Sequence, residues 1–223
     1  MGKLYVVATP IGNLKDITLR ALEVLQSVNF IACEDTRRTL ILLNHYKIQD
    51  KKLISYYEPK ESVQVPKVLK LLEKEDVALV SDAGTPAISD PGYKLIRGCI
   101  EKGIPVEVVP GPSSVLTALV GSGLPTDRFT FLGFLPRKGL EKFFEELKTY
   151  REDTLIAFEA NNRLLKSLQA MEKVYGGDVL LCVARELTKL HEEYVRGKLS
   201  EVLQELQQKE EIKGEVVLLW RIP

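Results

Sequence analysis

Short runs of apolar residues, each as long as a β-strand, recur through the first half of the chain. They occupy residues 4–8, 30–33, 77–80 and 106–109. Helical patterns separate them: after a capping Asp16 or Thr18, leucines recur every third position from Leu19, and residues 62–75 place apolar positions among lysines and glutamates. Pro66 is expected in the first turn of that second helix, where no amide partner is needed. Strands that alternate with helices and are rich in Val, Ile and Leu predict parallel βαβ units, with helices on both faces of the sheet.

The second half of the chain has more closely spaced strands. Strand patterns occupy residues 129–134, 154–158, 179–184, 193–199 and 215–220, and helical patterns occupy residues 138–150, 162–175 and 200–209. Such spacing predicts a mixed sheet with antiparallel members. The boundary is expected inside the Pro- and Gly-rich residues 110–125, which contain a linking helix at residues 113–121. The predicted fold class is therefore α/β, with an N-terminal lobe of residues 1–112 and a C-terminal lobe of residues 113–223.

The charge balance restricts the function. The 223 residues include 31 Lys and Arg and 31 Asp and Glu, so the formal net charge is zero. This argues against a protein that coats nucleic acid by bulk charge and against a polybasic membrane binder, but it leaves room for a local basic patch. Hydrophobic residues make up 45% of the chain, which is typical of a folded protein and excludes disorder as the main state.

The three cysteines lie far apart in apolar stretches, which indicates buried free thiols in a reducing cytosol. With only two histidines to add, no metal site is expected. The apolar N-terminal run is too short for a signal peptide. The longest uncharged run, residues 108–126, contains three prolines and would not form a membrane helix. We expect a cytoplasmic protein that has no membrane contact.

Four loops rich in special residues each follow a predicted strand, so each would lie at the carboxyl edge where open α/β sheets bind ligands. The first, residues 8–14 (ATPIGNL), makes a tight turn but matches neither the dinucleotide nor the ATP phosphate loop. The second, residues 81–92, holds two Asp, two Pro and two Gly. A carboxylate beside such small residues suits a sugar hydroxyl or an amino group.

The other loops carry polar groups whose roles stay open. Residues 109–114 (VPGPSS) open a helix, so the two serines either cap it or, with free amides, hold a carboxylate or another polar group. Residues 185–193 are either a solvated loop or the wall of a polar site. Residues 33–38 (CEDTRR) either cap the next helix through Asp35 or Thr36 or face a substrate. The candidates for a local phosphate-contacting patch are Arg37, Arg38, Arg137, Lys138, Arg163 and Lys166.

Taken together, these motifs resemble those of one family. The residues concerned are 4–14 (LYVVATPIGNL), 33–37 (CEDTR), 81–86 (SDAGTP), 109–114 (VPGPSS) and 185–189 (RELTK). The family is that of the small-subunit (16S) rRNA (cytidine-2′-O)-methyltransferases, within the tetrapyrrole-methylase superfamily of S-adenosylmethionine-dependent enzymes. The resemblance runs in order from Leu4 to about Trp220. Each loop alone is a weak signal, whereas the combined set is specific.

The resemblance implies two α/β lobes with S-adenosylmethionine in the cleft between them, and a homodimer. The acceptor it implies is a cytidine ribose in 16S rRNA, at the decoding region of the small ribosomal subunit. The positions that match the superfamily's cofactor-binding residues are Pro10, Asp82, Ala83, Gly84, Thr85, Ser113, Ser114, Glu159, Glu186 and Leu187. The residues expected to bind the rRNA substrate are Arg37, Arg38, Arg137 and Arg163.

The chain departs from the family in two places. Where the family has Glu-Ser-x-His-Arg, this chain has Glu159-Ala160-Asn161-Asn162-Arg163, so the Ser and the His are replaced. Many members also continue as a C-terminal helical extension, whereas this sequence ends at Pro223. If that extension grips the ribosome, this chain is expected to bind the ribosome differently or more weakly.

The implied reaction is an in-line attack of a ribose 2′-hydroxyl on the sulfonium methyl, so the protein mainly aligns donor and acceptor. A carboxylate or an amine must take the hydroxyl proton. We favour Glu34 or Lys189 as this catalytic base, from a set that also includes Asp35, Asp90 and Glu186. Arg37 could hold the neighbouring phosphate. Because a ribose inside folded rRNA is not free, we expect an exposed nucleotide on the assembled subunit as the substrate.

Two alternative functions stay open. One is another enzyme of the same superfamily, which would methylate a carbon of a corrin-type tetrapyrrole ring or a carboxylate of a modified elongation factor. Binding of a coloured tetrapyrrole would identify the ring methylase. The other is a non-catalytic, S-adenosylmethionine-binding ribosome-assembly factor, which would bind the cofactor without transferring its methyl group.

Overall fold

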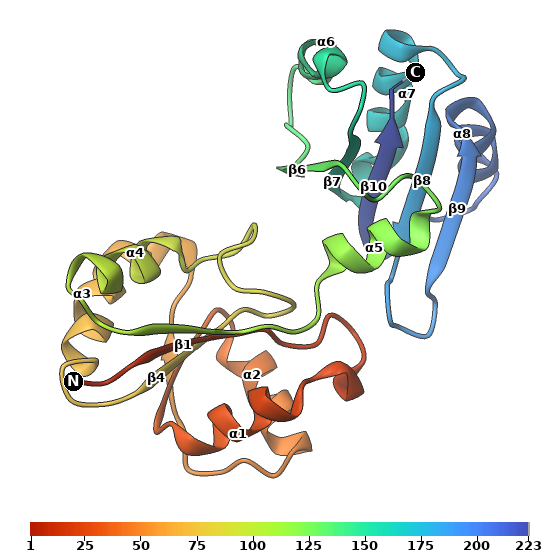
Figure 1. The fold of residues 1–223 in the computed structure, drawn as a ribbon. Helices are drawn as coiled ribbons and strands as arrows, with labels where there is room; N and C mark the ends of the chain where they lie inside the picture. The colour runs from red at the N-terminus through yellow and green to blue at the C-terminus, as the bar shows by residue number, and fades with distance from the viewer. Residues whose placement is uncertain (223) are drawn as a thin grey trace. The chain divides into compact units, whose positions relative to one another are not determined.

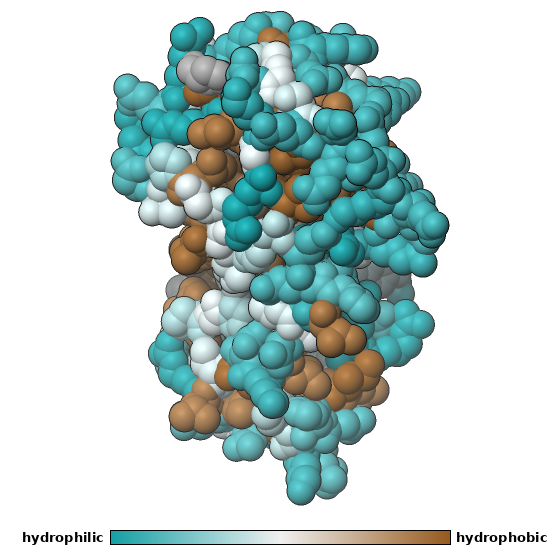
Figure 2. Space-filling model, turned by 90° about the vertical axis from the view of Figure 1, so that its right-hand side faces the viewer, coloured by the Kyte–Doolittle hydropathy of each residue, from teal (hydrophilic) through white to brown (hydrophobic). Residues whose placement is uncertain are grey.

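The computed structural model of the protein describes residues 1–222 and contains two compact units (Figure 1). The first unit is Met1–Ser113, and the second begins at Ser114. Each unit has its own five-stranded sheet with helices, which confirms the predicted α/β class. None of the helices in this described range is long and apolar enough to cross a bilayer. The face shown in Figure 2 is mostly hydrophilic, with separate hydrophobic patches.

The first unit is built on a parallel sheet in the order β3-β2-β4-β1-β5. Its strands are β1 (Leu4–Val7), β2 (Phe30–Cys33), β3 (Lys52–Ser55), β4 (Val77–Val80) and β5 (Val106–Val109). The central strand β4 is buried at every position, as expected for a strand covered on both faces. Parallel strands bring their carboxyl ends to one edge, so the loops after β1, β2 and β4 lie together there.

Helices cover both faces of this sheet (Figure 1). They are α1 (Leu19–Ser27), α2 (Thr36–His45), α3 (Glu61–Leu71) and α4 (Tyr93–Glu101). α1 and α2 pack on one face, and α3 and α4 pack on the other, which confirms the predicted βαβ arrangement. The Thr18 side chain accepts a hydrogen bond from the Ala21 amide and caps α1. The Asp35 side chain accepts a hydrogen bond from the Arg37 amide and caps α2.

The helix α3 differs from its prediction. A 3-10 turn (Glu58–Lys60) leads into a helix that begins at Glu61, so Pro66 lies in the second helical turn. The expectation of a first-turn proline is therefore wrong. Pro66 has no amide to donate to the Ser62 carbonyl four residues earlier. Both residues are exposed, so water can bind that carbonyl and the helix continues through the proline. The strand β3 and the helix α4 were not among the expected elements.

The second unit contains a mixed sheet in the order β6-β7-β10-β8-β9. Its strands are β6 (Phe129–Phe134), β7 (Thr154–Ala160), β8 (Leu180–Arg185), β9 (Glu193–Lys198) and β10 (Glu215–Arg221). The strands β6 and β7 are parallel, and the other neighbouring pairs are antiparallel. The prediction of a mixed sheet is confirmed.

The two faces of this second sheet are covered differently (Figure 1). Its helices are α5 (Ser114–Ser122), α6 (Leu140–Glu146), α7 (Leu164–Tyr175) and α8 (Leu199–Gln207). The helices α6, α7 and α8 pack on one face, around a core that includes Phe144 and Trp220. The helix α5 packs on the opposite face, over β8, β9 and β10.

Candidate functional site

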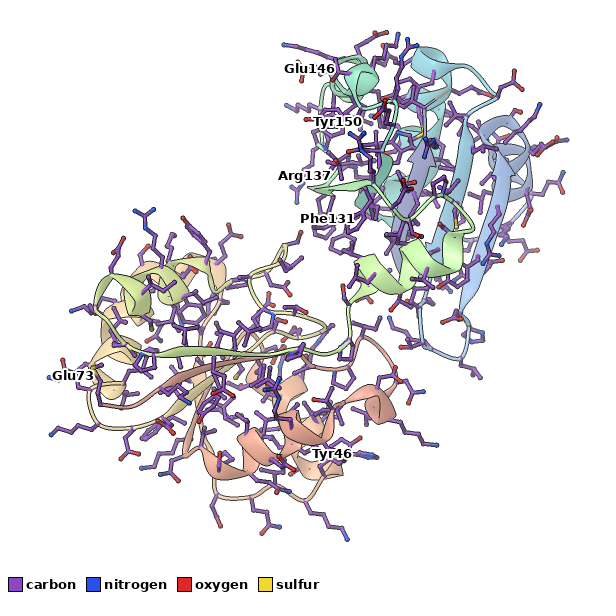
Figure 3. All side chains as sticks on the ribbon, in the orientation of Figure 1. Tyr46, Glu73, Phe131, Arg137, Glu146 and Tyr150 are labelled. Carbon is purple, nitrogen blue, oxygen red and sulfur yellow. The ribbon has the colours of Figure 1, made fainter. Side chains whose placement is uncertain are left out.

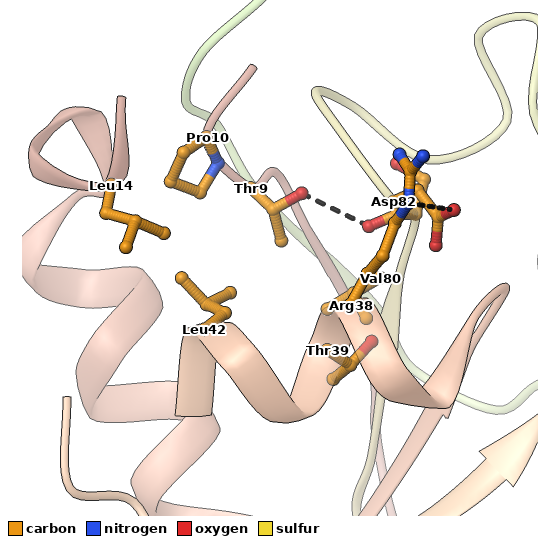
Figure 4. Close-up of a pocket in the computed structure, with 9 residues that line it drawn as sticks. Thr9, Pro10, Leu14, Arg38, Thr39, Leu42, Val80 and Asp82 are labelled. Carbon is orange, nitrogen blue, oxygen red and sulfur yellow. Dashed lines mark hydrogen bonds and ion pairs between the residues drawn. The ribbon is translucent and has the colours of Figure 1, made fainter. Parts of the chain in front are cut away.

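A pocket opens at the carboxyl edge of the first sheet (Figure 4). Pro10, Leu14 and Leu42 form an apolar end. Arg38 and Asp82 stand at the other end, with Arg38 Nε 3.5 Å from Asp82 Oδ2. The lining is completed by Thr9, Thr39, Val80 and Ser81. The pocket therefore offers a ligand both an apolar surface and a charged pair.

Hydrogen bonds join the loop after β1 to the loop after β4. The Thr9 amide donates to the Gly84 carbonyl at 2.9 Å, and the Gly84 amide donates back to the Thr9 carbonyl at 3.0 Å. The Thr9 hydroxyl donates to the Ser81 carbonyl at 3.2 Å. Gly84 has φ +80°, a left-handed conformation that suits glycine. The two joined loops carry the predicted cofactor-binding residues Pro10, Asp82, Ala83, Gly84 and Thr85.

Asp82 ties the loop after β4 to the loop after β2. Its Oδ1 accepts the Asp35 amide at 2.9 Å, while its Oδ2 faces Arg38. The Asp82 side chain keeps 22% of its surface exposed. Because each carboxylate oxygen has two lone pairs, Asp82 can accept a further hydrogen bond from a ligand.

Glu34 follows β2 directly and is half-buried at the same edge. Burial raises the pKa of its carboxyl, and the negative charges of Asp82 and Asp90 raise it further. The positive charge of Arg38 offsets only part of this effect. A carboxylate whose pKa is raised is a stronger base when it is ionised. The structure therefore gives Glu34 the electrostatic setting of a proton acceptor.

A buried carboxylate holds the far end of the loop after β4. Glu61 is only 6% exposed, and its Oε1 accepts the Tyr56 hydroxyl at 2.9 Å and the Gly92 amide at 3.1 Å. Its Oε2 lies 3.0 Å from Lys94 Nζ. Glu61 thus joins the start of α3 to the residue after β3 and to the start of α4.

The loop between these two anchors is strained. Ala87 has φ +69° and Ser89 has φ +61°, although neither is a glycine. Backbone in this region costs about 1–3 kcal/mol per residue and persists where the surroundings hold it. Asp82 holds the start of the loop and Glu61 holds its end, so both anchors stabilise the conformation that places Asp90 near Glu34.

The two arginines after β2 form ion pairs with aspartates. Arg37 Nε donates to Asp35 Oδ1 at 3.0 Å, and a second Arg37 nitrogen donates to Asp35 Oδ2 at 2.6 Å. These bonds and the Arg37 charge lower the pKa of Asp35 to about 2. The Arg37 side chain nevertheless remains 87% exposed. Its guanidinium is accessible to a phosphate, but much of its charge is already compensated.

In the second unit, Lys189 is held between two glutamates. Its Nζ lies 2.8 Å from Glu186 Oε1 and 3.0 Å from Glu215 Oε2. Burial lowers the pKa of Lys189, but the hydrogen bonds to the two glutamates and their charges outweigh it, so the pKa is raised. An ammonium with a raised pKa gives up its proton less readily, which weakens Lys189 as a base. The adjacent predicted residue Leu187 is buried at 6% exposure.

Glu159 and Arg163 act together within the second unit. Glu159 is buried and accepts both its neighbour's Ala160 amide, at 2.7 Å, and the Ser167 hydroxyl. Arg163 lies 3.3 Å from Glu159 Oε2 and donates to the Pro136 carbonyl at 2.6 Å. These contacts fix the turn after β6. They leave the predicted cofactor role of Glu159 and the predicted rRNA role of Arg163 as predictions.

The remaining predicted residues lie at segment ends. Ser113 ends the first unit, Ser114 begins α5, and Arg137 is exposed after β6. Sequence reasoning missed the anchoring pair Tyr56 and Glu61. No sequence pattern marks them, because their partners lie in other segments of the fold.

Comparison with known proteins gives the same family by two routes. The family model described as "Tetrapyrrole (Corrin/Porphyrin) Methylases" matches residues 3–203. A protein of Hydrogenobaculum sp. named "Ribosomal RNA small subunit methyltransferase I" is 56% identical, over 97% of this chain and 94% of that protein. The protein of the same name from Thermotoga maritima is 46% identical over 98% of both chains. Its namesake in Escherichia coli O157:H7 is 47% identical, over 98% of this chain and 77% of that protein.

Solved structures show the same fold at low identity. A diphthine synthase superposes with a TM-score of 0.77 at 13% identity, covering 99% of this chain and 90% of that one. A uroporphyrin III C-methyltransferase from Thermus thermophilus superposes with a TM-score of 0.68 at 19% identity, covering 99% of this chain and 97% of that one. Family model, relatives and fold agree, so the chain belongs to the tetrapyrrole methylases and, within them, to the family of ribosomal RNA small subunit methyltransferase I.

Proposed function

We propose that this chain transfers a methyl group from S-adenosylmethionine to the 2′-hydroxyl of a cytidine ribose in 16S rRNA, at the decoding region of the small ribosomal subunit. The observation that carries the proposal is the 46–56% identity, over nearly the whole chain, to proteins named for methylation of small-subunit rRNA. The site geometry supports it with a half-buried carboxylate, Glu34, and an open pocket, both at the carboxyl edge of a parallel sheet.

The first unit has groups that fit the cofactor. S-adenosylmethionine supplies a methyl group on a positively charged sulfur, together with ammonium, carboxylate and hydroxyl groups. Asp82 keeps a partly exposed carboxylate that can accept from an ammonium or a ribose hydroxyl. Gly84 presents backbone instead of a side chain at this edge. The residues we propose to hold the cofactor here are Pro10, Asp82, Ala83, Gly84 and Thr85. Ser113, Ser114, Glu159, Glu186 and Leu187 stay predictions from the family resemblance.

Glu34 is our proposal for the catalytic base. The ribose hydroxyl must lose its proton as its oxygen attacks the methyl group, and an ionised carboxylate can accept that proton. The pKa of Glu34 is raised, so its affinity for a proton is increased. Lys189 would first have to lose a proton that Glu186 and Glu215 stabilise. We therefore place Glu34 ahead of Lys189.

The pocket lined by the loop after β1, the helix α2 and the end of β4 is our proposal for part of the acceptor site. At its apolar end, next to the proposed cofactor residue Pro10, Leu14 and Leu42 suit the face of a nucleobase or ribose. Arg38 at the other end can reach a phosphate while it pairs with Asp82. The assembled subunit as substrate, a homodimer and a cytoplasmic location complete the proposal.

The test is methyl transfer from labelled S-adenosylmethionine to small subunits that lack the mark, with the product nucleoside identified by mass spectrometry. We expect label on a cytidine ribose. The Glu34→Gln variant should lose about 10²–10⁴-fold in kcat while it still binds cofactor. Glu73→Gln, which changes an exposed acid of the same unit, should behave as the unchanged protein. Label on a tetrapyrrole, or cofactor binding with no transfer to RNA, would refute the proposal.

A further inference from the structure

An irregular strand turns two phenylalanines of the second unit to the same side of its sheet. In the parallel pair β6–β7, Phe131 lies opposite Ile156 and Phe134 lies opposite Phe158, with a shift in register between them. Regular alternation would put residues 131 and 134 on opposite faces. The irregularity, where Gly133 has φ +69°, reverses this and places Phe134 on the side of Phe131.

The resulting cluster of rings is open to solvent. The ring centroids of Phe131 and Phe134 lie 5.0 and 5.3 Å from that of Phe158, in edge-on arrangements. Phe134 is 62% exposed, and Phe131 and Phe158 are half-buried. They lie on the sheet face opposite α6, α7 and α8, where α5 packs over β8, β9 and β10. Bulges often re-aim a side chain next to a functional site, and this one aims an apolar ring outward.

Free positive charge follows the strand that carries Phe131 and Phe134. Arg137 and Lys138 follow β6 and are exposed, and neither forms an ion pair with any of the residues that the structure describes. Figure 3 shows Arg137 and Phe131 at the same edge of the second unit. The turn that carries both cations is rigid, because Arg163 binds the Pro136 carbonyl and is itself held by a buried carboxylate.

We propose that these five residues, Phe131, Phe134, Phe158, Arg137 and Lys138, form an aromatic shelf that binds an unpaired segment of the RNA substrate. A base stacks on the exposed ring of Phe134, while Arg137 and Lys138 contact the flanking phosphates. Aromatic rings beside free cations are the combination that binds single-stranded nucleic acid without reading its sequence. The inference rests on the proposed function and adds to it the part of the protein that holds the substrate strand.

The size of the effect follows from the stacking of one base. Such a stack changes affinity by about 5- to 150-fold when the ring is removed. We therefore expect Phe134→Ala to raise the KM for small subunits, and the Kd for a short oligocytidylate, within that range while kcat stays the same. Phe134→Leu should bind oligocytidylate nearly as weakly as Phe134→Ala, because leucine is apolar but cannot stack on a base. Phe134→Tyr keeps an aromatic ring and should bind as tightly as the unchanged protein. Leu190→Ala is the matched control, since Leu190 is a 92% exposed apolar residue of the same unit.

A fluorescent variant tests the contact directly. The native Trp220 is fully buried, so Phe134→Trp adds the one exposed indole. A stacked base quenches indole fluorescence, so oligocytidylate should quench this variant and leave the unchanged protein unaffected. Quenching by S-adenosylhomocysteine without RNA would assign the shelf to the cofactor and overturn the inference.

The kinetic results separate the inference from the function it rests on. If the unchanged protein methylates RNA but Phe134→Ala and Phe134→Leu keep its KM, the shelf is refuted and the proposed function stands. If the unchanged protein methylates no RNA, the proposed function fails first. Thermal midpoints equal to that of the unchanged protein show that the variants are folded, as expected at an exposed position.

Discussion

Replacing Glu61 by alanine tests whether one buried carboxylate holds the strained loop of the first unit. The change leaves the Tyr56 hydroxyl and the Gly92 amide without their acceptor. An unsatisfied buried donor costs about 1–3 kcal/mol, so the two together give about 2–6 kcal/mol. Lys94 adds little, because its side chain is 56% exposed and water can replace the ion pair. We expect Glu61→Ala to lower the free energy of unfolding by at least about 2 kcal/mol.

The assay is denaturant unfolding at equilibrium, with a matched control in the same unit. Glu101→Ala removes an exposed carboxylate whose partner Arg97 is 63% exposed, and should cost no more than about 1 kcal/mol. If Glu61→Ala costs no more than this control, the Tyr56 and Gly92 donors find other acceptors and the reasoning is refuted. Transfer activity under native conditions should also fall, because the loop that carries Asp82 loses its far anchor.

The pH dependence gives an independent check of the same contact. Burial raises the pKa of Glu61, but the hydrogen bonds from Lys94, Tyr56 and Gly92 outweigh it, so the pKa in the folded protein is lowered from 4.5. A lowered folded-state pKa contributes stability above the unfolded value, and this contribution is lost as the pH falls through the folded value. The stability difference between the unchanged protein and Glu61→Gln should therefore be present at neutral pH and shrink below about pH 4.5. A difference that does not change with pH would contradict the assignment.

Three further predictions concern other parts of the molecule. Lys189→Met should lower kcat far less than the roughly 10²–10⁴-fold expected for loss of a catalytic base, as measured in the same transfer assay; a loss of that size would make Lys189 the base. Burial raises the pKa of Cys99 and Cys182 to about 11. Both thiols should therefore react with a chromogenic disulfide reagent much more slowly in the native protein than after unfolding. Equal reaction rates would contradict their burial. If only Arg137 and Lys138 of the shelf contact phosphates, log K for oligocytidylate against log salt should have a slope of about −1.4, and a much steeper slope would reveal further contacts.

The sequence patterns predict the central strands well, because those strands are continuous apolar runs. The predicted bounds of β2, β4 and β5 agree with the structure, and β1 ends one residue earlier than predicted. The strands β1, β2 and β4 have a neighbour on both sides within a sheet covered on both faces, so burial and pattern coincide there. The strand β5 lies at one edge, and only its last residue, Val109, is buried. The strand β3 lies at the other edge, begins with the exposed Lys52, and is defined by its pairing with β2 rather than by an apolar run. Pairing of this kind is a tertiary property, which local patterns do not carry.

The candidate site also contains parts that the sequence reveals and parts that it does not. Loops rich in Gly, Pro and Asp are recognisable from sequence, because these residues are needed for unusual backbone and for ligand contact. The anchor Glu61 is not recognisable, since it stands in a charged stretch that reads as a solvated surface. Its partners Gly92 and Lys94 belong to a later segment of the chain, at the start of α4, so the contact is not visible in the local sequence. What the sequence cannot show is which of its many charged residues the fold turns inward.

The pairing of charged residues, which the sequence does not show, also changes the expected basis of RNA recognition. Of the four arginines predicted to bind rRNA, Arg37, Arg38 and Arg163 each pair with a carboxylate of their own unit, whereas Arg137 pairs with no carboxylate within residues 1–222. A neutral chain whose arginines are largely compensated has little charge with which to hold an RNA backbone. This supports the proposal that its discrimination comes from contacts that duplex RNA cannot make, such as stacking on the exposed ring of Phe134. Weak phosphate attraction together with base stacking would favour an unpaired nucleotide, which is what we propose the assembled small subunit presents to this chain.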